Sequence, residues 1–142
     1  MIRTWIELHD SEVLQVHRSD VGVALLLDAY VHRWEQVKEG WRGTGWTQPV
    51  RCTIGHVAKS WKSPMLPARI SDGHLHTPDS EPGNLIPFPF NYEGPARLSV
   101  ILDTGVEFQL EGDAVRLEST GRAQYVEDLP DDLRPKGRAN SR

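Results

Sequence analysis

The sequence predicts an all-β fold, a single domain in which about eight to nine mainly antiparallel strands form a two-sheet sandwich or a flattened barrel. Three observations predict it. Short segments with alternating apolar and polar residues recur at intervals of roughly 8–12 residues. Twelve glycines and ten prolines among 142 residues supply turns between them. No long segment shows the apolar period of an amphipathic helix.

Each element of the first half follows from its own pattern. Residues 13–17 alternate apolar and polar side chains, as expected for a strand with one buried face. Residues 23–34 begin with apolar side chains on both faces, which predicts a central strand buried on both sides. A glycine-rich connection at 39–45 leads to a strand at 46–57, and two prolines indicate a loop at 58–67.

The next segments are shorter and more often interrupted. Residues 68–70 and 74–76 have strand patterns, separated by a tight turn at 71–73. Residues 77–84 are polar with two prolines, which predicts a surface loop. Residues 85–90 are apolar but carry alternate prolines. Because proline has no N–H to donate, this segment is expected at a sheet edge.

The clearest hairpin comes last. Residues 98–102 and 106–110 alternate strictly, and Asp103-Thr104-Gly105 forms the turn between them. After a turn at 111–113, further short strands are expected at 115–117 and 124–126.

Charge and composition divide the chain. The β domain is expected to span residues 1–132, and residues 133–142, rich in charge, Pro, Gly and Asn, are expected to form a flexible tail. The net charge is −4, with 16 basic and 20 acidic residues. Residues 1–70 carry 9 basic and 7 acidic side chains, whereas residues 71–142 carry 7 and 13. An acidic chain without a basic stripe is not expected to bind nucleic acid, because phosphate contacts supply most of that affinity.

Cysteine and hydropathy indicate the compartment. The single Cys52 excludes an internal disulfide, and its place in an alternating strand predicts a buried, inert thiol. The first residues lack the apolar core of a signal peptide, and no apolar run reaches the length of a membrane helix. We therefore expect a cytoplasmic protein that does not bind membranes.

Tryptophan gives the first candidate site. All five tryptophans fall within the first 61 residues. Trp34 and Trp46 are expected to lie across from each other on one hairpin, with Trp41 and Arg42 near its tip. Tryptophan and arginine are enriched where proteins bind partners, so these four residues form a candidate binding surface. The alternative interpretation is a local mini-core that covers one sheet.

Histidine gives the second candidate site. His74 and His76 are two apart on a predicted strand, so their side chains point the same way and could hold one metal ion. Glu81 follows five residues later. The alternative interpretation is a pair of exposed histidines beside a surface loop.

Several segments resemble a group of small uncharacterised bacterial proteins. The matching segments are Leu8-His9-Asp10-Ser11, residues 30–34, Gly45-Trp46-Thr47-Gln48, residues 84–89 and Tyr125-Val126-Glu127. The His-Asp-Ser opening ahead of a β-meander is also similar to some immunity proteins of bacterial toxin systems. That resemblance implies a binding role and carries over no catalytic residue.

Together these observations favour a non-enzymatic binding protein that needs no cofactor, with an immunity-type protein partner as one form of that role. The alternative is a small β-barrel enzyme or small-molecule binder, with or without metal at His74 and His76. A third hypothesis is a homodimer through the apolar edge segment, which would expose Phe88 and Phe90.

Overall fold

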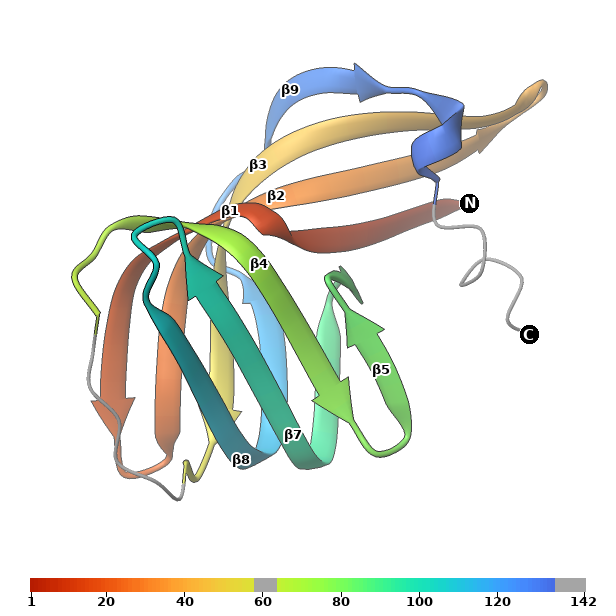
Figure 1. The fold of residues 1–142 in the computed structure, drawn as a ribbon. Helices are drawn as coiled ribbons and strands as arrows, with labels where there is room; N and C mark the ends of the chain where they lie inside the picture. The colour runs from red at the N-terminus through yellow and green to blue at the C-terminus, as the bar shows by residue number, and fades with distance from the viewer. Residues whose placement is uncertain (58–63, 135–142) are drawn as a thin grey trace.

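Strands make up most of the molecule. The computed structural model describes residues 1–57 and 64–134 (Figure 1). In chain order the strands are β1 (Ile2–Ser19), β2 (Gly22–Val37), β3 (Gly40–Gly55), β4 (Ala68–Thr77), β5 (Ser80–Gly83), β6 (Leu85–Pro87), β7 (Phe90–Leu102), β8 (Glu107–Ser119) and β9 (Gln124–Leu129). A short 3-10 helix, η1 (Asp131–Leu133), follows β9. No helix within these ranges is long and apolar enough to cross a membrane. The all-β prediction is confirmed.

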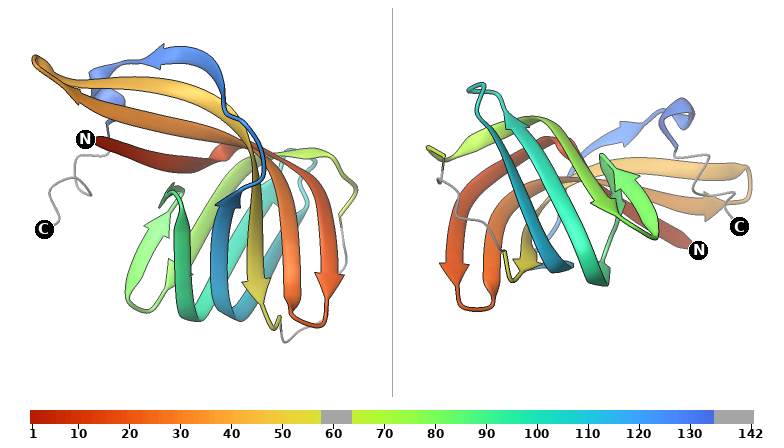
Figure 2. Two further views of the ribbon diagram at one scale, coloured as in Figure 1. Left: turned by 180° about the vertical axis from the view of Figure 1, so that it is seen from behind. Right: turned by 60° about the horizontal axis from the view of Figure 1, so that its bottom comes forward.

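Six of the strands form a closed barrel. Their order is β1–β2–β3–β8–β7–β4, and β4 pairs with β1 to complete the ring. Every pair in the ring is antiparallel. The closing contact is short and joins Glu12 to Arg69 and Val13 to Ala68. The closed barrel is a more exact description than the predicted two-sheet sandwich or flattened barrel, because the curved sheet brings its outer strands β1 and β4 together (Figure 2).

Strands β1, β2 and β3 are longer than the barrel needs. They contain 18, 16 and 16 residues, and one end of each projects away from the barrel (Figure 1, Figure 2). Strand β3 pairs with β8 through residues 50–55 and with β9 through residues 43–47. Strand β1 pairs with β4 on the barrel and with β6 on the projecting part. We call the projecting part the extension: residues 2–7 of β1, 30–37 of β2, 40–47 of β3, and β9.

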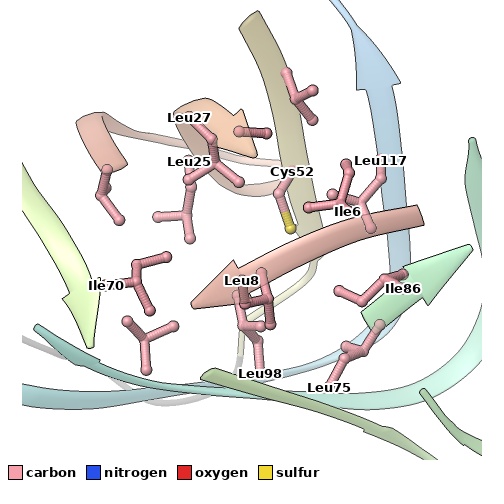
Figure 3. Packing of buried hydrophobic residues seen from close by; sticks show 14 of the residues in the cluster. Ile6, Leu8, Leu25, Leu27, Cys52, Ile70, Leu75, Ile86, Leu98 and Leu117 are labelled. Carbon is pink, nitrogen blue, oxygen red and sulfur yellow. The ribbon is translucent and has the colours of Figure 1, made fainter. Parts of the chain in front are cut away.

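Apolar side chains fill the barrel (Figure 3). Leu25 and Leu27 of β2 lie among Cys52, Leu98 and Leu117 from strands around the ring, and all five are at most 2% exposed. On β2 the alternate positions are only half-buried. The expectation that this strand is buried on both faces is therefore wrong, because the outer face of the barrel meets solvent.

Several predicted turns lie inside strands. Residues 39–45 belong almost wholly to β3, residues 71–73 to β4 and residues 111–113 to β8. The glycines that suggested turns serve close packing instead. A Cβ on Gly43 would overlap the Trp34 ring, and a Cβ on Gly112 would overlap the backbone of Gly55. The predicted loop at 77–84 is also largely strand, because it includes the β4–β5 hairpin.

The predicted edge segment lies where it was expected. Strand β6 forms one end of the strand order. Phe88 and Phe90, however, are half-buried and pack against the core, so they do not form the exposed apolar edge on which the homodimer hypothesis depends. The predicted flexible tail begins at Leu133, the last residue of η1. Most of that tail, residues 135–142, lies outside the described residues.

Candidate functional site

A β-bulge in β1 marks the junction between barrel and extension. Glu7 pairs with Tyr30 and Glu12 pairs with Asp28, so four residues of β1 lie opposite one residue of β2. The buried Ser11 hydroxyl donates to the Glu7 carbonyl at 2.6 Å and accepts from the Tyr30 N–H at 2.9 Å. Ser11 thus satisfies backbone groups that the interrupted ladder leaves unpaired.

Two further features hold the bulge: the backbone conformation of Asp10 and hydrogen bonds to Asn84, which lies outside β1. Asp10 has a φ of 77°, a left-handed conformation that Asp tolerates better than most residues. Asn84 accepts from the N–H of His9 at 2.7 Å through its side chain and from the N–H of Leu8 at 2.9 Å through its carbonyl. The His-Asp-Ser opening therefore forms a structural corner of β1.

A groove of about 610 Å³ opens at this corner. Its walls come from β1, β2, β3, β4 and the segment from β9 to η1. Six carboxylates line it: Glu7, Asp10, Glu12, Asp28, Glu127 and Asp128. Arg69 is the arginine among its described lining residues, and His9, Tyr30 and His32 complete the described titratable set. We call this cavity the acidic groove.

Two of its carboxylates lie directly opposite each other. Glu12 of β1 pairs in register with Asp28 of β2, so both side chains emerge on the same face. On its other side Glu12 pairs in register with Arg69 of β4. Like charges directly opposite on neighbouring strands destabilise a sheet. The Glu12–Asp28 pair therefore does not favour the fold, whereas the Glu12–Arg69 pair does.

The inner wall consists of two hydrogen-bonded pairs. His32 is 4% exposed, and its Nε2 lies 3.2 Å from Glu7 Oε1. The Tyr30 hydroxyl donates to Glu127 of β9, and the Tyr30 ring meets the His32 ring edge-on with centroids 5.4 Å apart. Burial, the hydrogen bond to Glu127 and nearby carboxylate charge raise the pKa of Tyr30 above its ordinary range. Tyr30 therefore remains a neutral donor that fastens β9 to the extension.

The predicted tryptophan surface divides between the interior and the opposite face of the extension. Trp34 pairs in register with Gly43, not with Trp46, and is 0% exposed. It belongs to the interior and cannot contact a partner in this state. Trp41 is half-buried, and the Arg134 guanidinium lies 5.3 Å from its ring centre.

Arg42 is exposed, and Trp46 is half-buried and packs partly against the core. They line a shallow groove of about 500 Å³ together with Arg33 and Tyr125. The Trp46 indole donates to Thr44 at 2.8 Å, its ring meets the Tyr125 ring edge-on, and the Arg33 guanidinium lies 5.7 Å from its centre. We call this surface the aromatic face.

The two predicted metal-ligating histidines converge on one carboxylate. His74 Nε2 and His76 Nδ1 each lie 3.0 Å from Glu81 Oε1. Hydrogen bonds from both rings lower the pKa of Glu81 below its ordinary range. This cluster lies on the β4–β5 hairpin, away from the acidic groove.

Cys52 lies in the barrel interior, as predicted. It is 2% exposed, and burial raises the pKa of its thiol to about 12. Such a thiol has almost no thiolate at neutral pH, so it is a poor nucleophile.

These features define a small closed β-barrel with a strand extension and an acidic groove at the junction. Comparisons with family models, with curated proteins and with solved structures found no match. The groove residues Glu12, Asp28, Tyr30 and Glu127 were missed as site residues by sequence reasoning. A signal existed for Asp28, which is the one carboxylate within the largely apolar run of residues 23–31.

Proposed function

We propose that the protein is a non-enzymatic binding domain whose acidic groove receives a basic segment of a protein partner. The observation that carries the proposal is the groove itself, whose described lining residues include six carboxylates and one arginine around about 610 Å³. Complementary charge speeds association and favours a basic partner over an acidic one. The sequence resemblance adds a more specific form, in which the partner is a toxin that this protein neutralises.

The opposed carboxylates support this proposal. Glu12 and Asp28 carry like charges at directly opposite positions in the folded protein, an arrangement that lowers stability. Residues that lower stability in this way are typical of functional sites. A lysine or arginine side chain placed between them would turn the repulsion into two attractions.

The aromatic face offers a second contact for the same partner. Trp46 and Arg42 lie on the extension, as does β9, which lines both grooves through Asp128. A partner that wraps around β9 would reach both surfaces. Trp41→Ala tests whether the tip of the extension takes part.

The alternative of a small-barrel enzyme requires an activated group. Cys52 and Tyr30, the two described groups with large pKa shifts, are both held in the less reactive neutral form, since burial raises the pKa of each. The acidic groove also repels phosphate, which supports a protein partner over nucleic acid.

The test uses a charge reversal that should leave the fold stable. Asp28→Lys places a cation opposite Glu12 and so replaces repulsion with attraction. The matched control is Glu107→Lys, which makes the same charge change on β8, opposite Ile101 and outside the groove. A fluorescent peptide of alternating lysine and glycine is titrated with each protein at low salt and followed by anisotropy.

We expect Asp28→Lys to weaken peptide binding at least about tenfold, equivalent to about 1.4 kcal/mol, and Glu107→Lys to change it much less. A peptide of alternating glutamate and glycine should not bind. Equal losses in the two variants would mean that only net charge attracts the peptide, and the proposal would then be wrong. A host protein retained by the wild type and by Glu107→Lys, but lost with Asp28→Lys, would identify the partner.

A further inference from the structure

We propose that His74, His76 and Glu81 form a binding site for a divalent transition metal of the zinc class. The site lies on the β4–β5 hairpin and goes beyond the proposed partner-binding function. Two imidazoles and one carboxylate are a ligand set that suits Zn²⁺, with a further position left for water or another ligand. The side chains of His74, His76 and Glu81 are 46%, 38% and 59% exposed, so the site leaves room for that ligand.

The ligand atoms are already close to the separation that a metal requires. All of them lie within 4.8 Å of one another, and each imidazole nitrogen is 3.0 Å from the same Glu81 oxygen. Tetrahedral zinc with bonds of about 2.1 Å separates its ligand atoms by about 3.4 Å. Each nitrogen–oxygen distance therefore needs to open by only about 0.4 Å.

A β-bulge in β5 creates this convergence. Leu75 pairs with Gly83 and Thr77 pairs with Ser80, so two residues of β5 lie opposite His76 alone. Of these two, Pro82 is buried and Glu81 is exposed. The bulge therefore directs the Glu81 carboxylate to the outer face, where His74 and His76 also lie.

The hairpin turn fixes the bulge in place. Thr77 is 1% exposed, and its hydroxyl donates to the Ser80 carbonyl at 2.8 Å and accepts from the Ser80 N–H at 3.2 Å. The Tyr92 hydroxyl of β7 donates to Asp79 in the turn at 3.2 Å. A ligand set held by its supporting strands loses little freedom on binding a metal, which favours affinity.

Stability alone does not account for the arrangement. Surface ion pairs contribute little to folding, and one would suffice to staple a hairpin. A second described group, Glu7, His9 and Asp10, also has its ligand atoms within 4.8 Å of one another. It offers one imidazole and belongs to the acidic groove, so the hairpin cluster is the better match for zinc, which favours nitrogen ligands.

The experiment uses untagged full-length protein that has been stripped with a chelator and dialysed. Zn²⁺ is titrated in competition with a chromophoric chelator, and Co²⁺ is added separately because its visible absorption reports the ligand set. The variants are His74→Ala, His76→Ala and the near-isosteric Glu81→Gln. The controls are His56→Ala, which disrupts an exposed histidine–carboxylate pair at 2.9 Å, and His9→Ala, which disrupts the second group.

We expect one Zn²⁺ per chain. Each site variant should weaken Zn²⁺ binding at least roughly 10- to 100-fold, because removing a residue that merely supports a metal ligand already costs that much. The control variants should stay within about twofold of the wild-type affinity. Circular dichroism and urea unfolding check that each variant folds, and Glu81→Gln keeps the test decisive if a histidine variant does not. Zn²⁺ binding that falls equally in His56→Ala would show an adventitious surface ion only. Loss of Zn²⁺ binding in His9→Ala alone would place the site in the acidic groove. Either result, or no Zn²⁺ binding by the wild type, would overturn the proposal.

Discussion

Asp28→Asn should make the protein more stable. The substitution keeps the size of the side chain and removes one of the two carboxylates that lie opposite each other across β1 and β2. Asp28 is half-buried and lies in the acidic groove, and its side chain makes no hydrogen bond or ion pair with another residue that the structure describes. Most substitutions at half-buried positions destabilise a protein, so a gain here is a distinctive outcome.

The magnitude follows from the register. Side chains directly opposite have Cβ atoms about 5 Å apart. Two unit charges at that distance repel by about 0.8 kcal/mol in water and by about 3 kcal/mol at an effective dielectric constant of 20. Because both carboxylates can rotate apart toward solvent, we expect the lower value, about 0.2–1 kcal/mol. This corresponds to a rise of roughly 1–5 °C in Tm for a chain of this size.

Urea unfolding at pH 7 and low salt measures the effect. Glu12→Gln should stabilise less than Asp28→Asn, because Glu12 also pairs in register with Arg69. In the double variant the second substitution should add little, since the repulsion is already gone. Glu107→Gln, opposite Ile101, controls for the change in net charge. In 1 M salt the gain should shrink, because the screening length falls to about 3 Å.

The reasoning fails if Asp28→Asn lowers stability, or if its effect and that of Glu12→Gln simply add. It also fails if Glu107→Gln stabilises as much, since net charge would then be the cause. A positive result would have a functional counterpart, because the same substitution should weaken binding of the lysine peptide.

Three further predictions concern the interior and the extension. Gly43→Ala should destabilise the protein by about 1–3 kcal/mol in urea unfolding, because its Cβ would overlap the buried Trp34 ring. Tyrosine titration followed by ultraviolet absorbance should show Tyr30 ionising above its ordinary pKa, since burial and Glu127 both raise it. A raised pKa stabilises the fold below about pH 10 and loses that contribution as the pH rises through the folded value, so Tyr30→Phe should flatten the alkaline loss of stability. A thiol reagent should modify Cys52 at pH 8 only as fast as the protein opens, because burial raises its pKa to about 12.

Alternation predicted the strands well where one face meets the barrel interior. Leu98 and Val100 of β7 pair with alternating residues of the neighbouring strand β8, and the turn between the two strands lies where the sequence predicts it. The same rule failed where glycine occupies a strand. Gly112 was interpreted as part of a turn, but it continues β8 because the backbone of Gly55 lies against it. Whether such a glycine lies in a turn or inside a strand depends on the neighbouring strand, which the alternation pattern does not identify.

Closure of the barrel was harder to foresee. It depends on two residues of β1, Glu12 and Val13, which reach β4 after the bulge has turned the strand. That bulge depends in turn on Ser11 and on Asn84, which is 75 residues away from its partner His9. A contact between segments so far apart has no local signature, so a sandwich and a barrel fit the sequence equally well.

Contacts between distant segments also explain why one candidate site could be predicted from the sequence and the other could not. His74 and His76 could be paired from sequence because neighbours two apart on one strand share a face. The acidic groove could not, because its carboxylates come from β1, β2 and β9 and meet only through strand register and the bulge. Strand register also explains why Trp34 and Trp46 were wrongly placed opposite each other, since Trp46 pairs with Val31. The register that closes the barrel thus brings Glu12 opposite both Asp28 and Arg69, so one set of strand pairings sets the stability of the junction and its charge.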